Sequence, residues 1–134
     1  MLLRELSNDS GRGRIWSPQP GVFASELQGM MTNEFAEAYI SVGNGVLEQC
    51  SRAVGIHDWS NMKGYESGVR MQVTNWAMGV ISRFDAIHVL SDSSVVRMGV
   101  SVANIALGGM IKVHQSPEDF AQIRDHLLRN KLAV

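Results

Sequence analysis

Apolar residues recur along this chain with two different periods. Short apolar runs, bounded by proline, glycine and small polar residues, predict strands at 14–17, 22–27, 53–58, 86–90 and 110–114, with 2–7 as a further edge strand. Between several of these runs, apolar residues repeat every three or four positions and so line one face of a helix. Two such stripes are Phe35, Tyr39, Val42 and Val46, and Val69, Val73, Trp76 and Val80.

Polar and small residues mark where the predicted helices begin and where they are weak. Asp92 or Ser93 is placed to cap the third helix, and Ser116 followed by Pro117 opens the last one. The first helix contains "GNG" at residues 43–45, and each glycine weakens it by about 1 kcal/mol relative to alanine. Either a kink or the close approach of another segment explains these glycines.

The predicted order of elements is β-β-α-β-α-β-α-β-α. Strands that alternate with helices through short connections form a mostly parallel sheet with helices packed against it. The proline and glycine residues at 18–21 join the first two strands in a turn, which makes them an antiparallel pair. We therefore expect one α/β domain over residues 1–134, with a mixed, mostly parallel sheet of four to five strands and about four helices.

The composition fits a single globular domain and narrows the range of functions. The chain has 134 residues, of which 45% are hydrophobic and 19% charged, and its net charge is -1. Arg4, Arg12 and Arg14 cluster near the N-terminus, as a solvated tail or a phosphate-binding arm, but no basic face continues from them. The single cysteine, Cys50, fits a reducing compartment, and we find no signal-peptide core or bilayer-spanning run. We expect a cytoplasmic protein that binds neither nucleic acid nor membranes.

The segment "HDWSNMKGYESG" at residues 57–68 joins a predicted strand to a predicted helix. In STAS domains, the fold of bacterial anti-sigma-factor antagonists, a strand ends in Asp–hydrophobic–Ser, and Asp-Ser-Ser-Gly or Asp-Ser-Thr-Gly opens the next helix. Asp58, Trp59 and Ser60, followed by "YESG" at 65–68, take those places here. Together with the order of elements, this makes the chain resemble a divergent STAS domain over about residues 12–130. The resemblance implies a bacterial, non-catalytic regulatory domain that binds a kinase or a sigma regulator.

Ser67 is the hydroxyl that corresponds to the phosphorylated position of that family. Glu66 stands where the family has aspartate, and Tyr65 adds bulk beside it. A helix N-terminus tolerates a phosphate, whose charge would change a partner-binding surface. The alternative is that Glu66 and Ser67 serve only the first turn of the helix. The expected partner surface, which includes the neighbouring helix start, comprises Asp58, Trp59, Ser60, Tyr65, Glu66, Ser67, Gly68, Asp92, Ser93 and Ser94.

The four histidines do not form a recognisable catalytic or metal-binding pattern. His57 lies at a strand end, His88 and His114 lie within strands, and His126 lies in the last helix, with no spacing that unites them. The sequence contains no HExxH, CxxC or Walker-type glycine loop. We therefore expect packed, hydrogen-bonded histidines and no catalytic residue, metal or cofactor. The alternative function is a small-molecule-binding or anion-binding domain that uses the strand ends and helix N-termini.

The helix expected at 95–107 is apolar on nearly all sides. One stripe consists of Val95, Met98, Val102 and Ile105, and a second consists of Val96, Val100, Ala103 and Leu107. A helix that covers one face of a sheet buries a single stripe, so the other stays exposed unless something covers it. We expect this helix to contact a protein partner or a second copy of the chain in a homodimer. The alternative for Met98 is that it fills space in the core.

Overall fold

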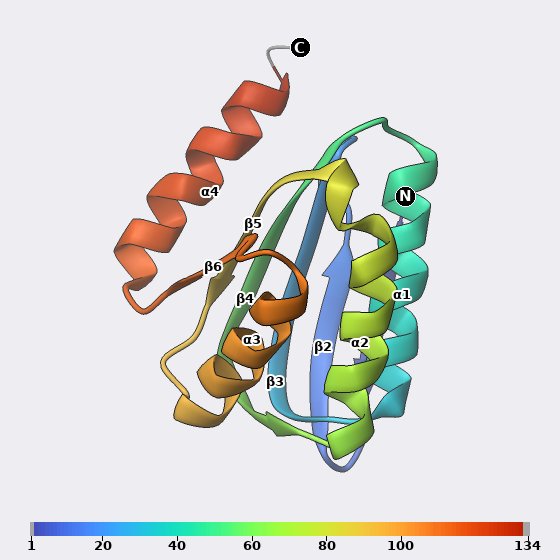
Figure 1. Ribbon diagram of the computed structural model, residues 1–134, viewed down its shortest axis with the longest axis vertical. Coiled ribbons are helices and arrows are strands. Elements are labelled where there is room, and N and C mark those ends of the chain that lie inside the picture. The colour runs from blue at the N-terminus through green and yellow to red at the C-terminus, as the bar shows by residue number, and fades with distance from the viewer. Residues whose placement is uncertain (1, 133–134) are drawn as a thin grey trace.

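The computed structural model describes residues 2–132 and contains one six-stranded sheet with helices on both faces (Figure 1). The strands are β1 (Leu3–Ser7), β2 (Gly11–Trp16), β3 (Val22–Met31), β4 (Ala53–Tyr65), β5 (Phe84–Leu90) and β6 (Ile111–His114). The helices are α1 (Asn33–Glu48), α2 (Ser67–Val80), a short 3-10 turn η1 (Ile81–Arg83), α3 (Ser94–Ala106) and α4 (Pro117–Leu132). None of the described helices has both the length and the apolar character of a membrane span.

The strands lie in the sheet in chain order, from β1 at one edge to β6 at the other. The pairs β1–β2 and β2–β3 are antiparallel, and all later neighbours are parallel. The predicted α/β class and the mostly parallel sheet are confirmed. The sheet has six strands rather than four to five, because the edge-strand candidate at 2–7 also pairs, as β1.

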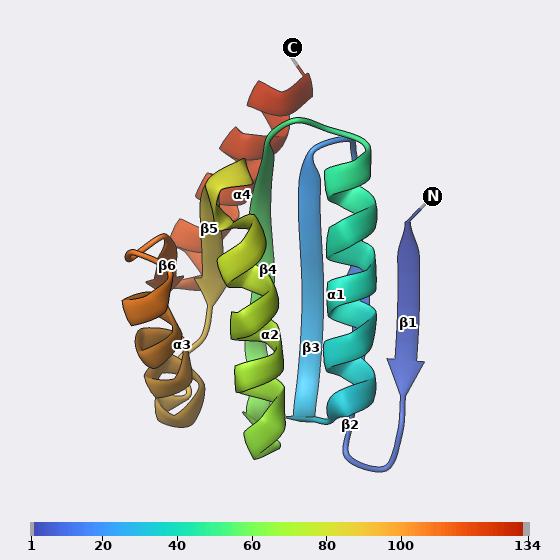
Figure 2. The ribbon, with the colours of Figure 1, turned by 45° about the vertical axis from the view of Figure 1, so that its right-hand side comes forward.

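Three helices cover one face of the sheet and one covers the other (Figures 1 and 2). The larger core lies beneath α1, α2 and α3, where Phe23, Phe35 and Val96 are almost completely buried. A smaller core lies beneath α4, where Phe120 packs against Val54 and other strand residues. Along β4, Ala53 packs in the larger core, and Val54 and Ile56 pack in the smaller one, as expected for a central strand with both faces covered.

Strands β3 and β4 are longer than the sequence predicts. We expected β4 to end at Asp58 and a loop to follow, but the strand continues to Tyr65, which pairs with Met31 of β3. Strand β5 pairs with β4 only as far as Asp58, so the outer part of β4 has β3 as its parallel neighbour. The polar residues and glycine of this segment are loop signals, but its backbone is paired in the sheet and Met62 is buried beneath the helices.

The glycines of α1 are explained by close approach of other segments. A Cβ atom built on Gly43 would lie 2.5 Å from the Trp76 ring of α2, and one on Gly45 would lie 2.7 Å from the Leu2 side chain. Either distance is shorter than ordinary van der Waals contact. Of the two explanations that the sequence left open, the structure supports the close approach, and it places the Trp76 indole directly against α1.

Helix α2 is packed differently from its neighbours. The backbones of α1 and α3 approach the strands closely, whereas the backbone of α2 lies closer to α1 and α3 than to any strand and so stands off the sheet. The predicted apolar stripe of α2 does face inward, but only Val69 is buried; Val73, Trp76 and Val80 stay partly exposed. A helix that stands off the sheet with its apolar face incompletely covered leaves space beneath it.

Candidate functional site

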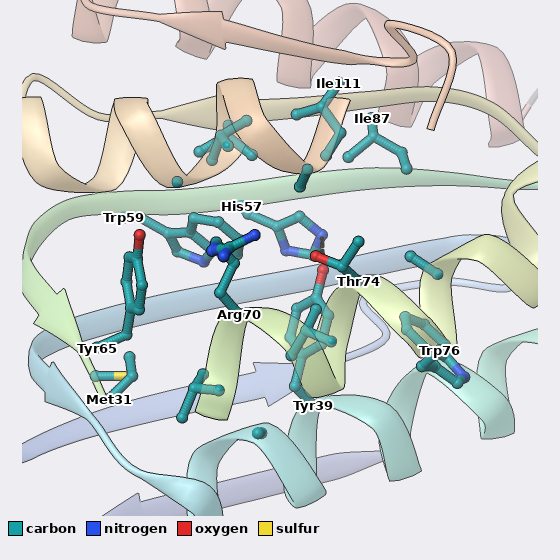
Figure 3. Close-up of a pocket in the computed structure, with 18 of the residues that line it drawn as sticks. Met31, Tyr39, His57, Trp59, Tyr65, Arg70, Thr74, Trp76, Ile87 and Ile111 are labelled. Carbon is teal, nitrogen blue, oxygen red and sulfur yellow. Dashed lines mark hydrogen bonds between the residues drawn. The ribbon is translucent and has the colours of Figure 1, made fainter. Parts of the chain in front are cut away.

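The space beneath α2 is a cavity of about 130 Å³ between the sheet and helices α1, α2 and α3. Its walls are almost entirely apolar or aromatic (Figure 3). Strand β4 contributes His57, Trp59, Met62 and Tyr65 to the lining, and the partly exposed side chains of α2 border the opening. A concave, mostly apolar space with a few polar groups is the usual form of a small-molecule site.

Tyr65 and Gly99 shape one end of this cavity. A Cβ atom on Gly99 would overlap the Tyr65 hydroxyl, so the glycine in α3 makes room for the Tyr65 ring. Trp59 also turns inward and stacks on His57, with ring centroids 5.3 Å apart and planes 22° apart. Both aromatic residues therefore lie in the cavity wall, although we expected them in a partner-binding surface loop.

A chain of side-chain hydrogen bonds links β4, β3 and α1 at the base of the cavity. Trp59 Nε1 donates to Ser25 Oγ at 2.9 Å, and Ser25 Oγ lies 2.7 Å from His57 Nδ1. On the other side of the ring, His57 Nε2 lies 2.9 Å from the Tyr39 hydroxyl. Because hydroxyls both donate and accept, either neutral tautomer of His57 makes both bonds. The four side chains come from α1, β3 and β4 and fix the imidazole at the base of the cavity.

Burial keeps this chain of side chains uncharged. Only 1% of His57 is exposed, and burial lowers the pKa of its imidazole to about 3. Burial also raises the pKa of the Tyr39 hydroxyl above its ordinary value. Both groups are therefore neutral near pH 7. The base of the cavity is polar but uncharged, and its hydrogen-bonding atoms already have protein partners.

In the part of the chain that the structure describes, the cavity lining contains one charged side chain. Of the described residues that line the cavity, Arg70 alone carries a charge, and it lies on α2 one turn before Thr74. Both side chains extend from α2 beside the cavity, on the side where Trp59 and His57 lie (Figure 3). Both are partly exposed, so they form the border between the apolar interior and solvent. The site thus combines an apolar body with a cationic rim.

The remaining residues of the expected partner surface fall into two groups. Ser60, Asp92 and Ser93 border an open polar depression that the turn between β1 and β2 completes. There the Ser60 hydroxyl donates to Asp58 Oδ1 at 2.6 Å, and the Ser93 hydroxyl accepts from Val96 N as the cap of α3, whose first residue is Ser94.

Glu66, Ser67 and Gly68 form the second group, at the start of α2. All three are exposed, and Glu66 occupies the N-cap position without a side-chain cap bond. A Cβ atom built on Gly68 would meet no atom within 4 Å, so this corner is open. None of these three residues lines the polar depression, whose lining from β4 is Ser60–Lys63.

Two histidines that seemed unrelated in the sequence form a pair. His88 Nδ1 and His114 Nε2 lie 2.8 Å apart, because β5 and β6 are parallel neighbours and the two residues sit diagonally across the register. Burial, followed by the positive charges of His114 and Lys112, lowers the pKa of His88 to about 4. No third ligand joins them: the described residues contain no group of three or more histidine, cysteine or acidic side chains suited to a metal ion.

The structure also adds residues that the sequence did not single out. Ser25 and Tyr39 complete the hydrogen bonds of His57, and Arg70 supplies the charge at the cavity. The helical stripe that contains Tyr39 was visible in the sequence, but its hydroxyl contact was not. Ser25 lies in a predicted strand with no neighbouring motif. Only the pairing of β3 with β4, which places Ser25 opposite His57, unites them.

Comparison with known proteins identifies the class of fold. No family model matches this sequence, and no curated protein matches it. Among solved structures, the chain is similar to one of SpoIIAA-like, and therefore STAS-like, fold. That structure is an uncharacterised protein of the DUF3478 family from Shewanella loihica PV-4, with a TM-score of 0.65 and 16% identity over 87% of this chain and 97% of that one. The STAS-like fold expected from the sequence is thus confirmed.

Proposed function

We propose that this chain is a non-catalytic, STAS-like binding domain that takes up a small apolar molecule in the cavity beneath α2. The observation that carries the proposal is the cavity itself, about 130 Å³ of apolar-walled space under a helix that stands off the sheet. An engineered apolar cavity of about 150 Å³ stays dry and binds benzene or xenon. A ligand with a body of about one aromatic ring therefore fits the size of this site.

The side chains around the cavity support binding rather than catalysis. His57 is neutral, buried and bonded on both ring nitrogens, so it has no free nitrogen to act as a base. Ser25, its hydroxyl neighbour, is not among the residues that line the cavity. A ligand there would meet aromatic and aliphatic walls and no activated nucleophile.

Ligand uptake would also act on the start of α2. A ligand that covers Val73 and Trp76 would bury further apolar surface between α2 and the sheet, where both side chains are only partly buried. The bound form would hold α2 more firmly, and the exposed residues Glu66–Gly68 belong to the same helix start. This coupling gives the domain a route from a small molecule to a surface that a protein partner reads.

The test is methyl NMR with benzene as the probe. We expect benzene to shift the methyl signals of Val73 and Val100, which line the cavity, and to leave Leu127 beneath α4 unchanged. Ala77→Leu fills the cavity from α2 and should abolish these shifts, whereas Ala106→Leu adds the same atoms at an exposed position outside the lining. Absence of cavity-specific shifts in the native protein, or their persistence in Ala77→Leu, would contradict the proposal.

A second candidate function rests on the outer stripe of α3. Val95, Met98, Val102 and Ile105 are exposed, and Ile105 is 85% exposed. A straight apolar stripe on one helix is self-complementary about a two-fold axis, so we propose that it contacts a second copy of the chain. Sedimentation equilibrium should show a dimer that Ile105→Glu converts to monomer, while the charge control Gln122→Glu on α4 leaves it intact. A native protein that is monomeric at high concentration would exclude this contact.

Phosphorylation of Ser67 remains a proposal from the STAS resemblance. The exposed position of Ser67 as the first residue of α2 supports it, because the helix N-terminus favours added negative charge. Intact-mass spectrometry of protein from its own cells, with peptide mapping of residues 58–70, tests it directly. A phosphate on Ser67 would make a switchable partner surface the leading model, and an unmodified protein throughout growth and stress would remove it.

A further inference from the structure

We propose that the ligand of the cavity is a small amphipathic carboxylate, with its apolar body beneath α2 and its carboxylate on Arg70. This inference rests on the proposed binding function and specifies the class of ligand. It follows from three features. These are the lack of a partner for the Arg70 charge among the described residues, the position of Arg70 in α2, and the distribution of polar groups between the base of the cavity and its rim.

Arg70 has no partner for its charge among the residues that the structure describes. The contrast with Arg83, which is also partly buried, is informative: Arg83 donates to the carbonyl oxygens of Leu47 and Cys50 at 2.7 and 2.6 Å. The ion pairs of the described chain involve Arg14, Arg52 and Arg124, and not Arg70. An arginine beside an apolar cavity, with all of its donors available, is suited to bidentate recognition of a carboxylate.

The position of Arg70 in α2 favours an anion further. Arg70 is the fourth residue of the helix, close to the positive end of the helix dipole, and the acidic residue nearest to it in sequence, the N-cap Glu66, is exposed and takes part in none of the ion pairs of the described residues. A cation at this end is mildly unfavourable for the helix alone. A bound carboxylate would neutralise both the guanidinium and the helix end, so the local conflict is resolved when the proposed ligand is present.

The polar groups also determine which way the ligand lies. The hydrogen-bonding atoms of His57 and Ser25 at the base are already paired and neutral, so a charge placed there would be desolvated without a partner. At the rim, the Thr74 hydroxyl lies one helical turn from Arg70 on the same face and provides a further donor. The apolar body therefore occupies the interior, and the carboxylate stays at the rim.

Phenylacetate and phenylacetamide are suitable probes, because they share one apolar body and differ in charge. We expect native protein to bind phenylacetate about tenfold or more tightly than phenylacetamide, as charge-assisted hydrogen bonds provide. Arg70→Gln should remove this preference and leave phenylacetamide binding unchanged. Arg129→Gln removes the same charge from an exposed position on α4 and should keep the preference. Methyl NMR titrations at constant ionic strength give the six dissociation constants, for two probes and three proteins.

The outcomes separate the two levels of the proposal. If both probes bind equally in the cavity and Ala77→Leu abolishes their binding, the ligand is not selected for a carboxylate. The proposed binding function would then still hold. A preference for phenylacetate that survives Arg70→Gln would also overturn the assignment of Arg70. If neither probe nor benzene shifts the cavity methyl signals, the binding function itself is wrong. If the preference for phenylacetate is lost in Arg70→Gln and kept in Arg129→Gln, the result supports both the binding function and the carboxylate site on Arg70.

Discussion

Acidification from pH 7 to pH 5 should destabilise this protein through His57. The unfolded chain binds a proton at this histidine with a pKa of about 6.5, whereas burial lowers the pKa in the folded protein to about 3. Between these values only the unfolded state is protonated, so stability is fully present above pH 6.5 and falls as the pH drops. At pH 5 the gap is about 1.5 pH units, which corresponds to a loss of about 2 kcal/mol of unfolding free energy from His57.

Urea denaturation, followed by tryptophan fluorescence at several pH values, measures this loss. The native protein should lose about 2 kcal/mol more than His57→Gln between pH 7 and pH 5, because the variant lacks the titrating group. His88, whose pKa is lowered to about 4, adds its own loss in the same range, but it is present in both proteins and cancels in the difference.

NMR titration of the His57 ring in the native protein provides a second measurement that does not depend on the variant. The ring should stay neutral down to pH 5 while the protein remains folded. Protonation of this ring between pH 6 and pH 7, or identical pH slopes for the native protein and His57→Gln, would refute the argument from burial.

Two further predictions concern packing around the same site. Tyr39→Phe leaves His57 Nε2 without its hydroxyl partner and should lower the unfolding free energy by about 1–3 kcal/mol, measured by urea denaturation at pH 7; an unchanged value would mean that water replaces the hydroxyl. Gly43→Ala should cost about 1–3 kcal/mol because its methyl group displaces Trp76, whereas Gly79→Ala, in open space on α2, should stabilise by up to about 1 kcal/mol. Equal effects of the two alanines in thermal unfolding would contradict the close contact.

The order of elements and the faces of the helices could be read from the sequence because they depend on local periodicity. The third helix is the clearest case: Val96 and Val100, on one predicted stripe, are buried, and Met98 and Ile105, on the other, are exposed. The helix cap at Ser93 was also predictable, because capping involves residues only three positions apart.

Features that depend on separate strands and helices could not be predicted in this way. The segment from Trp59 to Tyr65 has the polar residues and glycine of a loop, and it becomes strand only because β3 extends beside it. The contact between His88 and His114 depends on the register of β5 and β6. The cavity depends on how far α2 stands from the sheet, a distance that no periodicity encodes, so Arg70 looked like an ordinary helix residue.

The arrangement of the sheet in chain order has a consequence for how the protein forms during synthesis. Each strand from β2 onward pairs with the strand made immediately before it, so the sheet can grow by addition as the chain leaves the ribosome. The first two pairings close over short turns, at little entropic cost. Helix α3, which supplies one wall of the cavity, is made after α2, so apolar residues of α2 stay uncovered until late in translation. During that interval the exposed apolar face of α2 is open to association with other chains.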